Sequence, residues 1–125
     1  MIRSRSLGSW RVLIVIAVVA CARRVSNSAV PGGDVSRGAT ALAAFSCGAC
    51  HQIDGIAGAA GLVGPPLNGI ADRTMIAGEL PNTPDNMKRW IIDPQSVEPN
   101  TAMPNLHVSP IVARDMVAYL YTLRN

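Results

Sequence analysis

Apolar residues recur at helical spacing at three places in the chain, and each run begins with capping residues. The first run follows Asp34, whose side chain can cap a helix N-terminus. Val35, Ala39 and Leu42 then follow at intervals of three or four positions. We therefore predict a helix of about 11 residues that ends shortly before Cys47.

The second run lies between Thr83 and Pro94. Thr83 is a good N-cap residue, and Pro84 suits the first helical position, where its missing N–H would have no helical partner. Met87 and Ile91 lie four positions apart and share a face. We expect this helix to end before Pro94, because the residue preceding a proline disfavours the helical conformation.

The third run begins at Ser109 and Pro110, which again pair an N-cap residue with a proline at the first helical position. Val112 and Met116 follow at helical spacing. Together the three runs predict an all-α fold in one domain over residues 34–125.

The start of the chain has a different pattern. Arg3, Arg5 and Arg11 stand among the first eleven residues without any acid, and nine apolar residues follow at Val12–Ala20. Nine residues are too few to cross a bilayer, which takes about 20. A basic start before a short apolar run is typical of a secretory signal peptide, so we assign residues 1–20 to one.

The end of this run, Val18-Val19-Ala20-Cys21, resembles a bacterial lipobox. The resemblance implies cleavage before Cys21 and an acyl anchor on it. An ordinary cleavage site beside a chance cysteine, or an uncleaved signal anchor, are the alternatives. Residues 21–33 would then be the lipidated cysteine and a flexible tether, since polar residues, proline and glycine dominate there. Each version places the domain on the periplasmic side of a bacterial membrane.

Composition narrows the class of protein. Apolar residues make up 49% of the 125, which excludes a disordered chain, yet only five are aromatic. A large apolar cofactor would help to fill the core of so small a domain. From Asp34 onward the chain has six basic and eight acidic residues, and Lys88 is its one lysine. Such a balance is not that of a nucleic-acid-binding protein.

The segment Cys47-Gly48-Ala49-Cys50-His51 has the C-x-x-C-H spacing by which c-type haem is attached. Two thiols add to the vinyl groups on one edge of the porphyrin, and the two intervening residues form a turn that spans this edge. The adjacent imidazole then reaches the iron. We therefore predict that Cys47 and Cys50 hold one covalent haem and that His51 ligates its iron.

Three other uses of this cysteine pair fit less well. A redox-active C-x-x-C motif needs a βαβ context, which the sequence lacks. A structural zinc site needs four ligands, and only Cys21 and His107 remain as further candidates. A disulfide between Cys47 and Cys50 would leave His51 without a role.

From Gly33 to Asn125 the sequence resembles the class I cytochromes c, and it is similar to bacterial cytochrome c domains associated with cytochrome c oxidase. The resemblance implies the cytochrome c fold, in which three to five helices wrap around one covalently bound haem. It also implies an electron carrier rather than an enzyme. Its partners would be redox proteins such as a terminal oxidase or a dehydrogenase, with no nucleic acid among them.

The resemblance also assigns roles on the side of the haem that faces the histidine. In the family a proline after a glycine offers its carbonyl to this histidine, and Pro65 follows Gly64. Such a bond from His51 would fix the tautomer and raise the basicity of the ligand. An arginine eight residues later often pairs with a haem propionate, and Arg73 has that spacing. The alternatives are a plain Gly-Pro turn and a solvated arginine.

On the other side of the haem, the family's methionine ligand follows the helix-stopping proline by nine residues, as Met103 follows Pro94. Methionine ligation raises the reduction potential of the iron. Thr101 would hydrogen-bond a propionate or the inner backbone, and Trp90 would pack against the haem. Other candidates for the sixth ligand are Met75, Met87, Met116 and His107.

Two features concern the rest of the fold. The family's last helix crosses the first with an aromatic residue at the contact, where Tyr119 matches, and Gly38 or Ala39 would admit the close approach. Asn82 stands where mitochondrial members have a propionate-binding tryptophan, and their ring of lysines is missing. We therefore expect the propionate end of the pocket and the docking of partners to differ from the mitochondrial form.

The function expected from these residues is that of a membrane-tethered, monohaem cytochrome that shuttles single electrons between respiratory-chain partners. The alternative is a haem-based ligand sensor or peroxidase-like protein with a labile sixth ligand. That alternative needs an open position on the iron, which Met103 would occupy.

Overall fold

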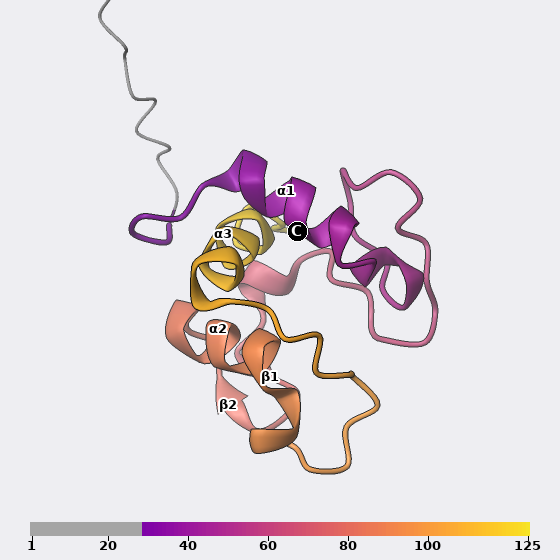
Figure 1. The fold of residues 1–125 in the computed structure, drawn as a ribbon, viewed down its shortest axis with the longest axis vertical. Helices are drawn as coiled ribbons and strands as arrows, with labels where there is room; N and C mark the ends of the chain where they lie inside the picture. The colour runs from indigo at the N-terminus through magenta and orange to yellow at the C-terminus, as the bar shows by residue number, and fades with distance from the viewer. Residues whose placement is uncertain (1–28) are drawn as a thin grey trace, which may run out of the picture.

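The computed structural model describes residues 29–125, and Figure 1 shows a helical protein in which α1 crosses one side of α3 and α2 lies along the other. The helices are α1 (Val35–Ala44), α2 (Pro84–Ile92) and α3 (Pro110–Leu120). The short elements are the 3₁₀ turns η1 (Cys47–Ala49), η2 (Ile70–Asp72) and η3 (Pro94–Ser96) and the strands β1 (Met75–Ile76) and β2 (Leu80–Pro81). The predicted all-α class is confirmed, since the two strands form a single small hairpin.

The predicted helix starts are all present. The side chains of Asp34, Thr83 and Ser109 each accept a hydrogen bond from the backbone N–H three residues later, at 2.8, 3.2 and 3.4 Å. These bonds satisfy donors that would otherwise have no helical partner. The ends also agree with the sequence: α1 has 10 residues, and α2 ends two residues before Pro94.

The folded domain begins earlier than the sequence predicts. Val30, which we assigned to the flexible tether, is buried in the hydrophobic core, and its carbonyl accepts a hydrogen bond from Gly33 N–H at 3.0 Å. The predicted signal peptide and Cys21 lie outside the described residues. None of the helices formed by residues 29–125 is long and apolar enough to cross a membrane.

The crossing of α1 and α3 depends on Gly38, as the sequence led us to expect. Gly38 is buried, and a Cβ there would overlap the backbone carbonyl oxygen of Asp115. Tyr119 lies at the same contact, with its own Cβ 3.0 Å from the place a Gly38 Cβ would take. The missing side chain thus lets the two backbones approach each other closely.

An ion pair between the buried Asp115 and the largely exposed Arg37 fixes the start of α1 to α3. Asp115 is 4% exposed, and its carboxylate accepts from Arg37 Nε at 2.7 Å and from the Asp34 backbone N–H at 2.9 Å. Burial alone would raise the pKa of Asp115, but these hydrogen bonds and the arginine charge hold it below its usual value. The carboxylate also lies at the positive end of the α1 dipole.

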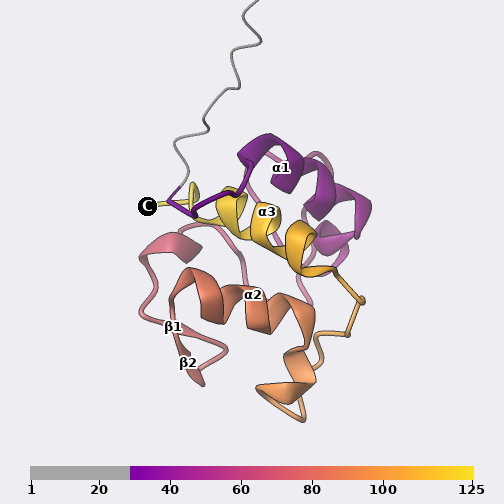
Figure 2. The ribbon, with the colours of Figure 1, turned by 60° about the vertical axis from the view of Figure 1, so that its left-hand side comes forward.

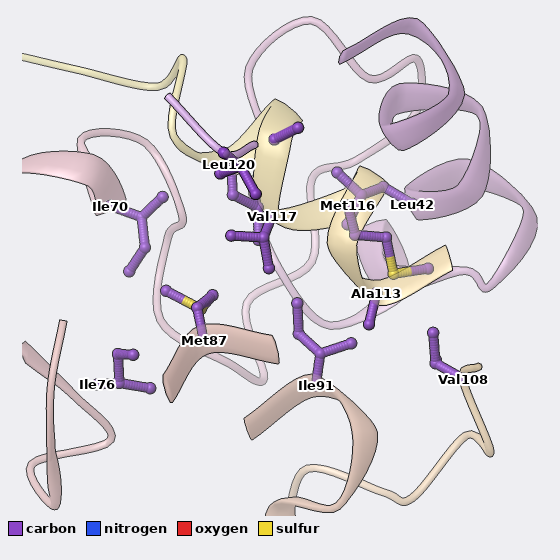
Figure 3. Close-up of a cluster of buried hydrophobic side chains, with 12 residues drawn as sticks. Leu42, Ile70, Ile76, Met87, Ile91, Val108, Ala113, Met116, Val117 and Leu120 are labelled. Atoms are coloured by element: carbon purple, nitrogen blue, oxygen red, sulfur yellow. The ribbon is translucent and has the colours of Figure 1, made fainter. Parts of the chain in front are cut away.

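The core lies between the three helices, and Figure 3 shows side chains from all of them directed into it. Met116 of α3 lies beside Leu42 of α1, while Met87 and Ile91 extend from α2 toward α3. The other labelled members are Ile70, Ile76, Val108, Ala113, Val117 and Leu120. All are aliphatic or methionine, so no aromatic ring fills the centre of this cluster.

Candidate functional site

The C-x-x-C-H segment forms a tight turn directly after α1. Ser46 adopts the left-handed conformation at φ 56° and turns the chain, and η1 then carries Cys47. The His51 N–H donates to the Cys47 carbonyl at 3.0 Å, which closes one turn around the two cysteines. Both thiols are half-buried and unpaired, and burial raises the pKa of the Cys47 thiol. The turn therefore presents two free thiols from one short segment.

The following loop wraps around this turn. Gly61 N–H donates to the Gly48 carbonyl at 3.0 Å, and Gly64 N–H donates to the Cys50 carbonyl at 2.8 Å. These bonds satisfy carbonyls of the turn that no helix uses. The turn and the loop thus form one unit that leads the chain to Pro65.

His51 makes the hydrogen bond that the sequence led us to expect. Its Nδ1 lies 2.7 Å from the Pro65 carbonyl oxygen. A carbonyl can only accept, so Nδ1 carries the proton and Nε2 keeps a free lone pair, the form in which imidazole ligates a metal. Gly64 packs against the ring, and a Cβ there would overlap it. The imidazole is therefore fixed in both tautomer and orientation.

A chain of hydrogen bonds continues from this point to the C-terminal end of α3. The Arg73 guanidinium donates to the Pro66 carbonyl. Asn82 Nδ2 donates to the Arg73 carbonyl at 2.8 Å and to the Ile70 carbonyl at 2.8 Å. Tyr121 OH donates to Asn82 Oδ1 at 2.7 Å. Asn82, where the sequence departs from mitochondrial relatives, thus holds the arginine segment in place.

Met103 is held in its loop through both of its backbone polar groups. Its N–H donates to Thr101 Oγ1 at 3.2 Å, and its carbonyl accepts from Gln95 Nε2 at 2.8 Å. Thr101 thus bonds the inner backbone, one of the two roles expected for it. Gln95 is a contributor that sequence reasoning missed, because nothing in its neighbourhood distinguishes it from a solvated glutamine.

An apolar cavity joins the two halves of the site. Its volume is about 50 Å³, and none of its lining residues is charged. They come from all three helices and both loops: Leu42, Cys47, Leu67, Ile70, Met87, Trp90, Ile91, Met103, Leu106, Val108, Met116 and Leu120. Trp90 and Met103 also line an outer hollow together with Cys50 and Pro65. Cys47 thus lines the inner cavity, Cys50 and Pro65 line the outer hollow, and Trp90 and Met103 lie between the two.

The rival ligands differ in position. His107 is exposed, with φ 54°, and lines neither hollow. Met75 is 42% exposed and lines neither as well. Met87 and Met116 do line the inner cavity, but both are fully packed in the core. Met103 alone of these five is half-buried on a loop at the opening.

The donor set and the cavity suit a haem. Two thiols, a neutral imidazole and a thioether are soft or intermediate ligands of the kind that bind haem iron and its vinyl groups. The uncharged lining suits the apolar macrocycle, and Arg73 supplies a cation near the loop for a carboxylate. Of the predicted site residues, His51 and Arg73 line neither hollow and contact the adjacent carbonyls of Pro65 and Pro66 instead. Cys21 lies outside the described residues.

Comparisons with known proteins agree with this geometry. The family model described as Cytochrome c matches residues 35–124. Cytochrome c oxidase subunit 2 of Alkalihalophilus pseudofirmus is 36% identical over 80 residues, which are 63% of this chain and 22% of that subunit. The chain thus spans only about a fifth of the length of this relative. The crystal structure of cytochrome c2 from Rhodobacter sphaeroides matches with a TM-score of 0.53 and 21% identity, over 74% of this chain and 97% of that one, and shares its fold.

Proposed function

This chain belongs to the cytochrome c family, and we propose that it is a monohaem, membrane-tethered cytochrome that shuttles single electrons between respiratory partners. Family membership means that it binds haem c covalently and serves as an electron carrier, and the predicted cytochrome c fold is confirmed. One haem is proposed because the sequence contains one C-x-x-C-H segment.

When bound, the haem supplies an iron atom that gains or loses one electron. Cys47 and Cys50 would hold the haem through two thioether bonds, and His51 and Met103 would ligate its iron. The hydrogen bond to Pro65 keeps the imidazole oriented in both oxidation states. A ligand set that does not rearrange suits rapid electron exchange.

The observation that carries this proposal is the placement of Met103. Its side chain lines the same apolar cavity as Cys47, while two hydrogen bonds, from Gln95 and to Thr101, hold its backbone. A thioether held in this way occupies the sixth position rather than leaving it open to a substrate. This favours an electron carrier over a ligand sensor or a peroxidase.

We further propose a lipid anchor at Cys21 on the periplasmic side of a bacterial membrane. Each buried CH₂ of an acyl chain contributes about 0.8 kcal/mol to membrane binding. The described chain begins on the opposite side of the helices from the loops 50–66 and 97–108 (Figures 1 and 2). A tether attached there would leave the opening of the cavity accessible to partners.

A terminal oxidase is the acceptor that the comparisons favour. The relative from Alkalihalophilus pseudofirmus is named as a subunit of cytochrome c oxidase, and this chain matches 22% of its length. A domain that is joined to an oxidase subunit in one protein can act as a separate chain in another. Electron donors such as a dehydrogenase would use the same haem.

Substitution of Met103 tests the ligand assignment. In the full-length, haem-loaded protein, Met103→Ala should let the reduced iron bind carbon monoxide readily, and the reduction potential should fall because the thioether is lost. Met75→Ala is the matched control and should behave as wild type. Rapid carbon monoxide binding by the wild type, or no change in the Met103→Ala variant, would favour the sensor.

A further inference from the structure

The opening of the cavity is bordered by two loops that contain no charged residue. Residues 55–71 and residues 99–113 include no Lys, Arg, Asp or Glu. The two loops meet at the outer hollow, where Val63 and Pro65 of the first lie together with Ala102 and Pro104 of the second. Neither loop thus contributes a charge of its own to the side on which a partner would approach, and the guanidinium of Arg73, which donates to the Pro66 carbonyl, is the cation known to lie against the first loop.

This border is also unusually apolar for a surface. Leu62 is 81% exposed and Val63 is 78% exposed, and they are adjacent in the sequence. Leu106 is 37% exposed and also lines the inner cavity. Pro65, Ala102 and Pro104 are exposed as well. We call these six residues the apolar rim. Contiguous exposed apolar side chains around a cavity are typical of interaction sites.

We propose that the apolar rim is the docking surface for a redox protein whose matching patch is itself apolar and uncharged. This inference rests on the proposed function, because the rim surrounds the site assigned to the haem. A charged partner patch would lose its hydration on contact without meeting an opposite charge, which is unfavourable. An apolar patch would instead remove Leu62 and Val63 from water.

Among residues 29–125, several charges away from the apolar rim lie next to charges of the opposite sign. Several are paired within the chain, as Arg37 is with Asp115, Lys88 with Asp85 at 2.7 Å, and Arg124 with Asp72 at 2.7 Å. The groove between α2 and α3 contains cations and carboxylates together. Association through the apolar rim should therefore be insensitive to ionic strength, unlike electrostatically steered docking.

Voltammetry on coated gold electrodes tests this with defined surfaces in place of the unidentified partner. The full-length, haem-loaded protein is applied to monolayers that end in methyl, carboxylate or ammonium groups. We expect the strongest redox current on the methyl surface. That current should stay constant from about 0.01 M to about 1 M salt, which shortens the Debye length from roughly 30 Å to 3 Å.

Substitutions that introduce one charge into the apolar rim test whether the rim itself makes the contact. Leu62→Asp and Val63→Asp should each lower the rate of electron exchange on the methyl surface about tenfold, without changing the absorption spectrum. Ile111→Asp is the matched control, since Ile111 is 65% exposed but lies in the groove between α2 and α3. It should exchange electrons at the wild-type rate.

The outcomes separate this inference from the proposed function. No redox current on any surface, or with a small dissolved mediator, would contradict the electron carrier itself. A salt-sensitive current that is largest on a charged monolayer would overturn the apolar rim while leaving the carrier intact. So would a wild-type rate in both Leu62→Asp and Val63→Asp. A rim-dependent dimer in sedimentation, abolished by Leu62→Asp, would assign the rim to self-association instead and would also overturn it.

Discussion

At the scale of single residues, hydrogen bonds to backbone carbonyls decide where the candidate ligands lie. His51 is oriented by Pro65, and the next residue, Pro66, is held by Arg73. Tyr121 donates to Asn82, and Asn82 donates to the backbone carbonyl of Arg73, so both hold the arginine segment in place. Burial raises the pKa of Tyr121, so its hydroxyl stays protonated and donates throughout the physiological pH range. The orientation of the imidazole therefore depends on a residue near the end of the chain.

Tyr121→Phe should raise the reduction potential of the haem-loaded protein. Loss of the bond to Asn82 loosens the Arg73 segment and with it the hydrogen bond of His51, so the imidazole becomes less basic and stabilises the oxidised iron less. We expect a rise of about 10–30 mV, less than the 59 mV that corresponds to a tenfold change for one electron. Potentiometric titration measures it.

Tyr119→Phe is the matched control for this substitution. Tyr119 lies two positions before Tyr121, in the last turn of α3, and its hydroxyl donates to the backbone carbonyl of Asp54 at 2.6 Å. Its loss should destabilise the fold by about 1 kcal/mol without shifting the potential. An equal shift in both variants would mean that Tyr121 has no special connection to His51.

At the scale of elements, the site depends on the packing of α1 against α3. Helix α1 ends shortly before Cys47, and residues of α3 line the cavity. Gly38 permits the close crossing, and Asp115 ties the start of α1 to α3. The position of the cysteine turn relative to the cavity therefore depends on the contact between α1 and α3. The contribution of the Asp115 hydrogen bonds to the stability of this contact should vary with pH.

Asp115→Asn should destabilise the fold at pH 7 by about 1–2 kcal/mol, because a charge-assisted hydrogen bond with the largely exposed Arg37 is lost. The pKa of Asp115 is below the unfolded value of about 3.9, so the carboxylate stabilises the fold fully at neutral pH. This contribution disappears as the pH falls through the folded pKa. Urea unfolding of both proteins should thus show a difference that shrinks on acidification. A constant difference would contradict it.

The helices were predictable from sequence because their signals are local. Capping residues and prolines stand within a few positions of the helix ends that they determine, as at Asp34 and Thr83. The hairpin was not predicted, because each of its strands has only two residues. Its turn also places Ala77 at φ 53°, a conformation that an alanine in the sequence does not indicate. Arg37 and Asp115 are 78 positions apart, so no local pattern in the sequence indicates that they pair.

The candidate site divides in the same way. The sequence contains the C-x-x-C-H segment and the Gly-Pro pair from which we expected a contact between His51 and Pro65. The structure has this contact. The support that Gln95 gives to Met103 could not be read from the sequence. A glutamine side chain makes a hydrogen bond wherever a free carbonyl comes near, and only the folded chain shows which carbonyl that is.

At the scale of the whole molecule, the three helices and two loops enclose an apolar cavity instead of a continuous core. The chain has only five aromatic residues, and the four that the structure describes are only partly buried at the border of the core cluster. Between the helices and loops the side chains also leave an apolar cavity of about 50 Å³ with an uncharged lining, which they do not fill themselves. Folding and binding of the haem should therefore be linked.

Removal of both attachment thiols tests this linkage. The Cys47→Ser/Cys50→Ser protein, prepared without haem, should be largely unfolded at 25 °C, because ligand binding to the folded state contributes much of its stability. Circular dichroism with temperature would show low helix content and no sharp transition. A cooperative thermal transition in this variant would show instead that the chain packs without the cofactor.

The central claim is that one covalent haem is held between His51 and Met103 in a chain that carries electrons. The absorption spectrum of the oxidised, full-length protein tests it most directly, because bonding between a thioether sulfur and ferric iron gives a charge-transfer band that no nitrogen or water ligand produces. We predict that this band is present in the wild type and absent from the Met103→Ala variant. A wild-type spectrum without the band, or a band that survives in Met103→Ala, would contradict the claim.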